Sequence, residues 1–260
     1  MYEVIDFHTH PGYDFHRFEH GVDITPARFR EDLVENGISR ACGSVIESAM
    51  TRVPLEGQEE VMRGLNRRAL ALGGPGGELE GFYLPGIHVH PAFVRASCEE
   101  IEKAVAMGAR LVGELVPYMT GWKEYSCPGM IEIARFAAEL GMVMSIHPSN
   151  PEDMSRLAAE VPNLKLVVAH LSGYGQFEAH LEMLRRYENV CFDYSAHGSD
   201  RDGTLHRAID CGGRERVLFG TDYPGVGPAG DLAAAFHEDL TDVELEAFLC
   251  GNAKRLLGIA

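Results

Sequence analysis

The sequence has little positive charge and lacks long hydrophobic runs. Its 23 Lys and Arg residues face 39 Asp and Glu residues, which gives a formal net charge of −16 at pH 7. A surface this acidic repels phosphate backbones and anionic lipids, so we expect neither a nucleic acid nor a membrane as partner. No apolar run reaches the ~18 residues of a membrane span, and no signal-peptide pattern precedes the first predicted strand. The sequence therefore predicts a cytoplasmic protein.

Familiar cofactor and disulfide motifs are also missing. The six cysteines are scattered without a CxxC pair, which favours buried free thiols in a reduced protein. The glycine-rich segment 73–77 lacks the Lys-Ser/Thr pair of a P-loop, and Pro75 has no backbone N–H to offer a phosphate. No GxGxxG follows the first predicted strand, which argues against an open, doubly wound nucleotide-binding sheet.

Apolar strand-like runs instead alternate with amphipathic helical segments along the whole chain. This alternation is typical of βα units around a parallel sheet, and 260 residues suit one barrel of about 250 residues. We therefore predict an α/β fold, a single (β/α)8 TIM-type barrel, as one domain over residues 1–260. The predicted strands cover residues 2–8, 38–46, 82–89, 110–116, 142–146, 164–169, 190–194 and 216–220. The predicted helices cover residues 25–36, 55–72, 97–107, 127–140, 151–161, 176–187, 203–211 and the tail.

Metal-binding side chains stand where these predicted strands end. Asp6, His8 and His10 alternate along the first strand and so share one face. The barrel fold places its active site at the carboxyl ends of the strands, which surround one cavity. Imidazoles and carboxylates together suit Zn²⁺ or a similar ion. The residues that could bind it are His8, His10, Glu114, His147, His170 and Asp222.

Several segments resemble the amidohydrolase superfamily, within it the branch that includes aminocarboxymuconate-semialdehyde decarboxylase. They are IDFHTH at 5–10, SIHPS at 145–149, VVAHLSGYG at 167–175, NVCFDYSA at 189–196, LFGTDYP at 218–224 and GNAKRLLGI at 251–259. The resemblance implies that His8, His10 and His147 are metal ligands. It implies that His170 is a second-metal ligand or an acid/base group, and that Asp222 contacts the metal and handles the proton of its water.

Glu114 departs from that branch and resembles the bridging carboxylate of binuclear members. The segment 112–115 is also similar to TatD-type hydrolases, so the sequence leaves open whether one or two divalent ions, most simply zinc, are bound. Four further side chains near the rim are predicted to contact substrate: His197, Tyr118, Trp122 and Tyr174. We expect Asp6 to orient a histidine ligand, and His180, His206 and His237 to face solvent.

The main functional prediction is a metal-dependent hydrolase. It would use an activated water on a small-molecule amide, lactone or ester, with Asp222 and His170 as catalytic groups. A metal-dependent decarboxylase, a TatD-like phosphodiesterase and a non-catalytic metal-binding barrel are the alternatives. Substrate specificity is predicted to lie in the loops at residues 13–23, 118–125 and after the seventh strand. Whether the protein forms a homo-oligomer is left open.

Overall fold

Eight parallel strands form one sheet in sequence order, which confirms the predicted barrel. The structure is a computed structural model and describes residues 2–12, 24–47 and 53–260. Each strand is short and rich in branched or aromatic residues, as parallel strands buried on both faces usually are. The strands are β1 (Ile5–Thr9), β2 (Arg40–Ser44), β3 (Tyr83–Ile87), β4 (Leu111–Leu115), β5 (Val143–Ile146), β6 (Lys165–Val168), β7 (Val190–Asp193) and β8 (Val217–Leu218).

Backbone hydrogen bonds between the two ends of the chain's sheet close the barrel. The Phe7 N–H donates to the Phe219 carbonyl at 2.9 Å, and the Asp222 N–H donates to the His8 carbonyl at 2.8 Å. Thr9 forms a parallel bridge with Tyr223. The predicted strand at 216–220 shrinks to the two residues of β8, because the chain beyond it turns onto β1. This closure places Asp222 beside the HxH segment.

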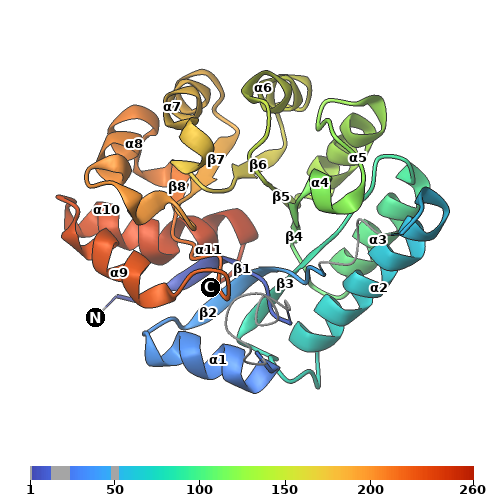
Figure 1. The fold of residues 1–260 in the computed structure, drawn as a ribbon, viewed down its shortest axis with the longest axis horizontal. Coiled ribbons are helices and arrows are strands. Elements are labelled where there is room, and N and C mark those ends of the chain that lie inside the picture. Colours follow the sequence, from blue (N-terminus) through green and yellow to red (C-terminus); the bar gives the residue numbers. More distant parts are fainter. Residues whose placement is uncertain (1, 13–23, 48–52) are drawn as a thin grey trace.

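The helices surround the strands, and proline starts five of them (Figure 1). Proline suits the first helical position because that residue's N–H has no intrahelical acceptor. The helices are α1 (Pro26–Glu35), α2 (Leu55–Gly73), α3 (Val94–Ala106), α4 (Pro117–Thr120), α5 (Pro128–Glu139), α6 (Pro151–Glu160), α7 (Phe177–Arg186), α8 (Thr204–Gly212), α9 (Pro228–His237), α10 (Asp242–Glu246) and α11 (Asn252–Leu257). Short turns of other helical type are η3 (Gly173–Gly175), η4 (Gly198–Asp200), η5 (Arg214–Arg216) and η6 (Ala247–Gly251). None of the helices in the described part of the chain is long and apolar enough to cross a bilayer.

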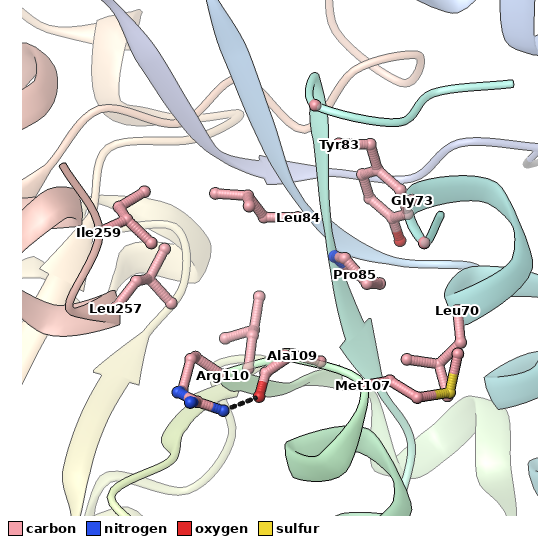
Figure 2. Close-up of a pocket in the computed structure, with 14 residues that line it drawn as sticks. Leu70, Gly73, Tyr83, Leu84, Pro85, Met107, Ala109, Arg110, Leu257 and Ile259 are labelled. Atoms are coloured by element: carbon pink, nitrogen blue, oxygen red, sulfur yellow. Dashed lines mark hydrogen bonds between the residues drawn. The ribbon is translucent and has the colours of Figure 1, made fainter. Parts of the chain in front are cut away.

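The amino end of the barrel is filled by apolar side chains. All eight strands contribute to one cluster there, and Leu256 and Leu257 of α11 pack against it. Beside it, an apolar pocket of about 130 Å³ lies between the start of β3, the start of β4 and the last residues of the chain (Figure 2). The Arg110 guanidinium at its edge donates to the neighbouring Ala109 carbonyl at 3.0 Å. In this fold the amino end stabilises the barrel, and the carboxyl end holds the chemistry.

Gly43 lets β1 and β2 approach closely next to the site. Its φ is +147°, and a Cβ at this position would lie 1.9 Å from the Thr9 carbonyl oxygen. Gly43 pairs with Thr9 across a register shift in β1, between His8 and His10 in sequence. The backbone of β2 therefore has to be free of a side chain here for β1 to end as it does.

We predict that Gly43→Ala lowers the free energy of unfolding by about 3 kcal/mol or more, because backbone must move to admit the methyl group. Gly230→Ala is the matched control, since Gly230 lies in α9 with open space around its Cβ position. The control should be neutral or stabilise by about 0.5–1 kcal/mol. Urea unfolding of both variants in a chelator measures the difference, and equal midpoints would contradict it.

Candidate metal centre

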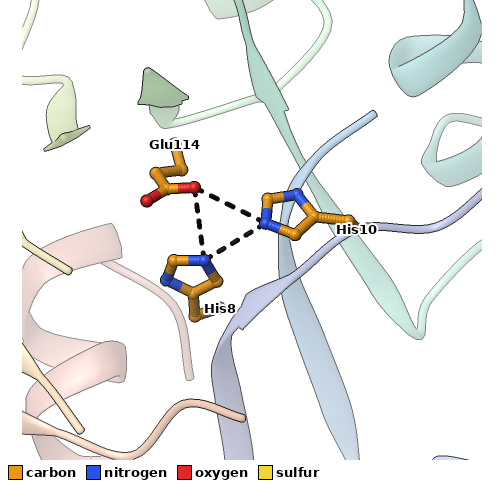
Figure 3. A group of neighbouring side chains, drawn as sticks. All are labelled: His8, His10 and Glu114. Atoms are coloured by element: carbon orange, nitrogen blue, oxygen red, sulfur yellow. Dashed lines mark hydrogen bonds and ion pairs between the residues drawn. The ribbon is translucent and has the colours of Figure 1, made fainter. Parts of the chain in front are cut away.

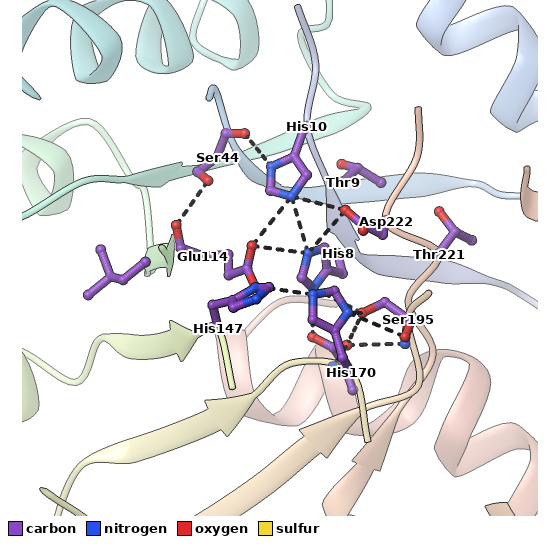
Figure 4. A network of polar contacts seen from close by, with 12 residues as sticks. His8, Thr9, His10, Ser44, Glu114, His147, His170, Ser195, Thr221 and Asp222 are labelled. Atoms are coloured by element: carbon purple, nitrogen blue, oxygen red, sulfur yellow. Dashed lines mark hydrogen bonds and ion pairs between the residues drawn. The ribbon is translucent and has the colours of Figure 1, made fainter. Parts of the chain in front are cut away.

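Six side chains from five strand ends meet at the carboxyl end of the barrel (Figure 4). Five of them are at most 7% exposed, and the Asp222 side chain is 22% exposed. Three overlapping groups among them have ligand atoms within 4.8 Å of one another. We call this set the histidine–carboxylate cluster; its members are His8, His10, Glu114, His147, His170 and Asp222. The structure thus brings together every residue predicted as a metal ligand.

The HxH pair and Glu114 form a compact triangle of donor atoms (Figure 3). The two histidine Nε2 atoms are 3.2 Å apart, and they lie 3.4 and 3.5 Å from Glu114 Oε2. Asp222 Oδ1 lies 3.6 Å from His8 Nε2 and 3.3 Å from His10 Nε2. Ligands around a tetrahedral ion with bonds of about 2.0–2.2 Å are separated by about 3.3–3.6 Å. These four atoms therefore fit one divalent ion.

The second oxygen of Glu114 faces a different pair of histidines. Its Oε1 lies 2.9 Å from His147 Nδ1 and 3.5 Å from His170 Nε2. The two imidazole ring centres are 4.9 Å apart. One buried carboxylate is thus shared by two groups of donors, one on each of its oxygens, which is the arrangement of a carboxylate that could bridge two ions.

Hydrogen bonds to the far ring nitrogens orient three of the imidazoles. His8 Nδ1 lies 2.9 Å from Asp193 Oδ2, His10 Nδ1 donates to the Ser44 carbonyl at 2.9 Å, and His170 Nδ1 lies 2.9 Å from Ser195 Oγ. A metal-binding histidine usually has its other nitrogen held in this way, because the contact fixes the tautomer and the ring. The arrangement leaves each Nε2 directed at the cluster.

The sequence analysis assigned no role to Asp193 or Ser195. Asp193 is fully buried at the end of β7, and its Oδ1 accepts the backbone N–H groups of His170 and Ser195 at 3.1 Å each. It therefore joins the β6 and β7 ends to the His8 ring. The available signal was a charged residue at the end of an apolar strand, within the segment NVCFDYSA.

Charge within the cluster outweighs the cost of burial. Burial opposes the charged form of His8, but the Asp193 and Glu114 carboxylates raise its pKa well above the ordinary value. Burial likewise opposes ionisation of Glu114, while the charges of His8 and His147 hold its pKa well below the usual range. The pKa of Asp222 is also lowered, against burial, by its hydrogen bond to His10 and the charge of His8. Both carboxylates are therefore ionised at neutral pH and attract a cation.

The loops that present these residues contain strained backbone. Within the described residues, four positions other than glycine have a positive φ: His170 and Tyr174 at 56°, Ala196 at 58° and Asp222 at 71°. All four follow β6, β7 or β8. Such residues cost free energy and concentrate where function fixes a side chain. Two of the four belong to the cluster itself.

The other predicted site residues occupy different surroundings. Asp6 was expected to orient a histidine ring, but it accepts from the His8 backbone N–H at 3.1 Å and from the Thr221 hydroxyl at 2.6 Å. Burial raises the pKa of Asp6 to about 7, against these hydrogen bonds. Trp122 is 8% exposed and packs edge-on against Tyr125 in the core, because the chain folds back after α4.

Tyr118, Tyr174 and His197 lie at the mouth of the cluster. Tyr118 and Tyr174 each contact the His147 ring with centres 5.4 Å apart, and Tyr174 lies 5.7 Å from His197. His206 and His237 are exposed as expected, but the expectation for His180 was wrong. His180 is fully buried on Phe192 and donates to the Leu171 carbonyl at 2.8 Å. The predicted specificity loop at 13–23 lies outside the described residues.

A barrel that gathers imidazoles and carboxylates at its carboxyl end defines a class of enzymes with divalent-metal sites. The family model described as "Amidohydrolase" matches residues 5–259, so the chain belongs to the amidohydrolase family. No curated protein sequence matches it.

Solved structures share the fold at low sequence identity. A 2,6-dihydroxybenzoate decarboxylase from Rhizobium is 16% identical with a TM-score of 0.75, and the match covers 99% of each chain. A 5-carboxyvanillate decarboxylase from Sphingomonas paucimobilis is 15% identical with a TM-score of 0.73, over 100% of each chain. A dihydroxybenzoic acid decarboxylase from Polaromonas sp. JS666, with bound manganese and 2-nitroresorcinol, is 16% identical with a TM-score of 0.73, over 99% of this chain and 97% of that one.

We predict that Asp193→Asn weakens zinc binding about 10- to 100-fold, because the His8 ring loses the acceptor that fixes its tautomer. Asp210→Asn is the matched control, since Asp210 pairs with the exposed His206 at 3.3 Å. Competition with a chromophoric chelator gives both dissociation constants. The role of Asp193 would be refuted by equal affinities in the two variants.

We also predict that metal binding releases protons. Burial disfavours a charged His10, but hydrogen bonds from Asp222 and Glu114 raise its pKa to about 9, so the metal-free site holds a proton at pH 7. A cation must displace it, and apparent affinity should rise about tenfold per pH unit for each displaced proton. Calorimetric titration with zinc in buffers of different ionisation enthalpy measures the release. A binding enthalpy that is the same in every buffer would contradict this.

Proposed function

We propose that the protein is a hydrolase with two divalent metal ions that acts on an amide, lactone or ester of a small molecule. The observation that carries this proposal is Glu114, whose two oxygens face two separate histidine pairs. A single-ion site has no need for a buried carboxylate in that position. Two ions about 3.5–4 Å apart are typical of hydrolytic metal sites.

Each residue of the cluster has a place in this arrangement. His8, His10 and Asp222 would hold the first ion, and His147 and His170 the second, with Glu114 between them. The mixed nitrogen and oxygen donors suit zinc, and manganese, present in the dihydroxybenzoic acid decarboxylase, is the alternative. His170 is then a ligand, and Asp222 is the group left to move protons.

The bound ions would supply an acidified water and would polarise the carbonyl to be cleaved. Asp222 is ionised and faces the cluster from a strained turn, so it can accept the proton of the attacking water. That water adds to the carbonyl carbon, and the C–N or C–O bond then breaks. Asp222 returns the proton to the departing nitrogen or oxygen, which leaves a carboxylic acid and an amine or alcohol. Asp193 and Ser195 keep the histidine rings in position during both steps.

A decarboxylase is the second candidate, and the solved structures named above favour it. In that reaction the C–C bond to a substrate carboxylate breaks, CO₂ leaves and the remaining carbon takes a proton. His170, directed at the centre through Nε2, would supply that proton. This reading needs one ion only and gives Glu114 no role as a ligand shared between two.

The number of bound ions separates the two candidates. We predict two zinc equivalents per chain in the wild-type protein and one in Glu114→Gln, with a fall of at least about 100-fold in hydrolysis of a panel of lactones and nitrophenyl esters. Glu100→Gln is the control, since Glu100 is also buried but pairs with Arg63 and Asn66 between α2 and α3. It should retain both ions and full activity.

Elemental analysis after removal of loosely bound metal gives these counts. One equivalent in the wild-type protein, unchanged in Glu114→Gln, together with release of CO₂ from an aromatic acid, would replace the hydrolase by the decarboxylase.

A further inference from the structure

Tyr174 is held over the cluster by an unusual backbone. It is the middle residue of η3, which follows β6, and its φ of 56° lies between Gly173 and Gly175. Its ring lies edge-on to three imidazoles, with centres 5.4 Å from His147, 6.3 Å from His170 and 5.7 Å from His197. The side chain is nevertheless 60% exposed.

The left-handed conformation is one that glycine adopts freely and tyrosine does not. A third glycine at this position would therefore remove the strain from the turn. The side chain is retained at a cost to stability, and such outliers justify a functional hypothesis. The ring itself is what a glycine would lose, and the ring faces the candidate metal centre.

Tyr118 places a second exposed ring beside the same imidazole. It belongs to α4, after β4, and is 64% exposed, while its ring centre lies 5.4 Å from that of His147. The interplanar angles to His147 are 78° for Tyr118 and 66° for Tyr174. Two large apolar faces thus stand at the entrance of a polar centre, where a bound molecule would cover them.

We propose that Tyr118 and Tyr174 form a binding site for a planar unsaturated ring, carried by the substrate next to the group that reaches the metal ions. Flat rings pair with aromatic side chains in edge-on or offset contacts, which a saturated chain cannot match. A cavity of about 470 Å³ adjoins Tyr174 and is lined also by His197, Thr204 and Arg207, so substituents on the ring have room. This site rests on the proposed function, because the ring is placed relative to the metal ions.

Two hydroxamates test the site without knowledge of the substrate. Both bind zinc through the same oxygens, but benzohydroxamate carries a phenyl ring and acetohydroxamate only a methyl group. With the zinc-loaded protein, we expect Tyr174→Gly and Tyr118→Ala each to weaken benzohydroxamate about 3- to 10-fold while acetohydroxamate changes less than about twofold. Phe236→Ala is the control, since Phe236 is also 52% exposed but contacts Tyr2 instead.

A second measurement tests the strain separately. Tyr174→Gly and Tyr174→Ala both remove the ring, but only alanine keeps the unfavourable φ. Thermal unfolding should therefore give Tyr174→Gly the higher Tm, which reverses the usual order of these residues. A higher Tm for Tyr174→Ala would overturn the assignment of strain.

The outcomes separate this inference from the proposed function. An unchanged ratio of the two hydroxamate affinities in both tyrosine variants would refute the ring site and leave the hydrolase intact. A loss of ring preference in these variants, with one ion per chain and CO₂ release, would support the ring site and refute the hydrolase. Failure of both hydroxamates to bind the zinc-loaded wild-type protein would overturn both.

Discussion

The structure depends on one buried negative charge, that of Glu114. A carboxylate that is 3% exposed is costly to ionise unless opposite charges surround it. Here four imidazoles lie within 3.5 Å of its two oxygens, two on each side. Without a cation, the histidines must carry protons to balance it. With two cations, the same donors are satisfied as neutral imidazoles, and this is why we read the cluster as a metal centre.

The barrel supplies the precision that such a centre needs. Closure of β8 onto β1 brings Asp222 to the HxH pair, and Asp193 ties the ends of β6 and β7 to the His8 ring. Strained turns then direct His170 and Asp222 inward. Rigid strand ends with fixed outer hydrogen bonds keep donor atoms in place before an ion arrives, which reduces the cost of binding. The apolar amino end stabilises this frame without taking part in the chemistry.

Much of this could be predicted from the sequence because strand ends in a barrel converge whatever their separation along the chain. The alternation of strands and helices predicted the fold, and His8, His10, Glu114, His147, His170 and Asp222 were predicted to meet. The second layer could not be predicted in the same way. Asp193 acts through a contact between distant strands, and Asp6 makes backbone and Thr221 contacts that no local pattern reveals.

Burial was the other property that the local pattern missed. Trp122 and His180 look like accessible residues in a loop and on a helix, but tertiary packing covers both. The positive φ of Tyr174 is equally invisible in the sequence, although the flanking glycines hint at a tight turn.

X-ray absorption spectroscopy of the zinc-loaded protein tests the central claim most directly. If Glu114 joins two ions, the spectrum contains a metal–metal scattering path at about 3.5–4 Å, and this path disappears in Glu114→Gln. A spectrum of nitrogen and oxygen neighbours alone, with no metal–metal path and no change in Glu114→Gln, would contradict the account.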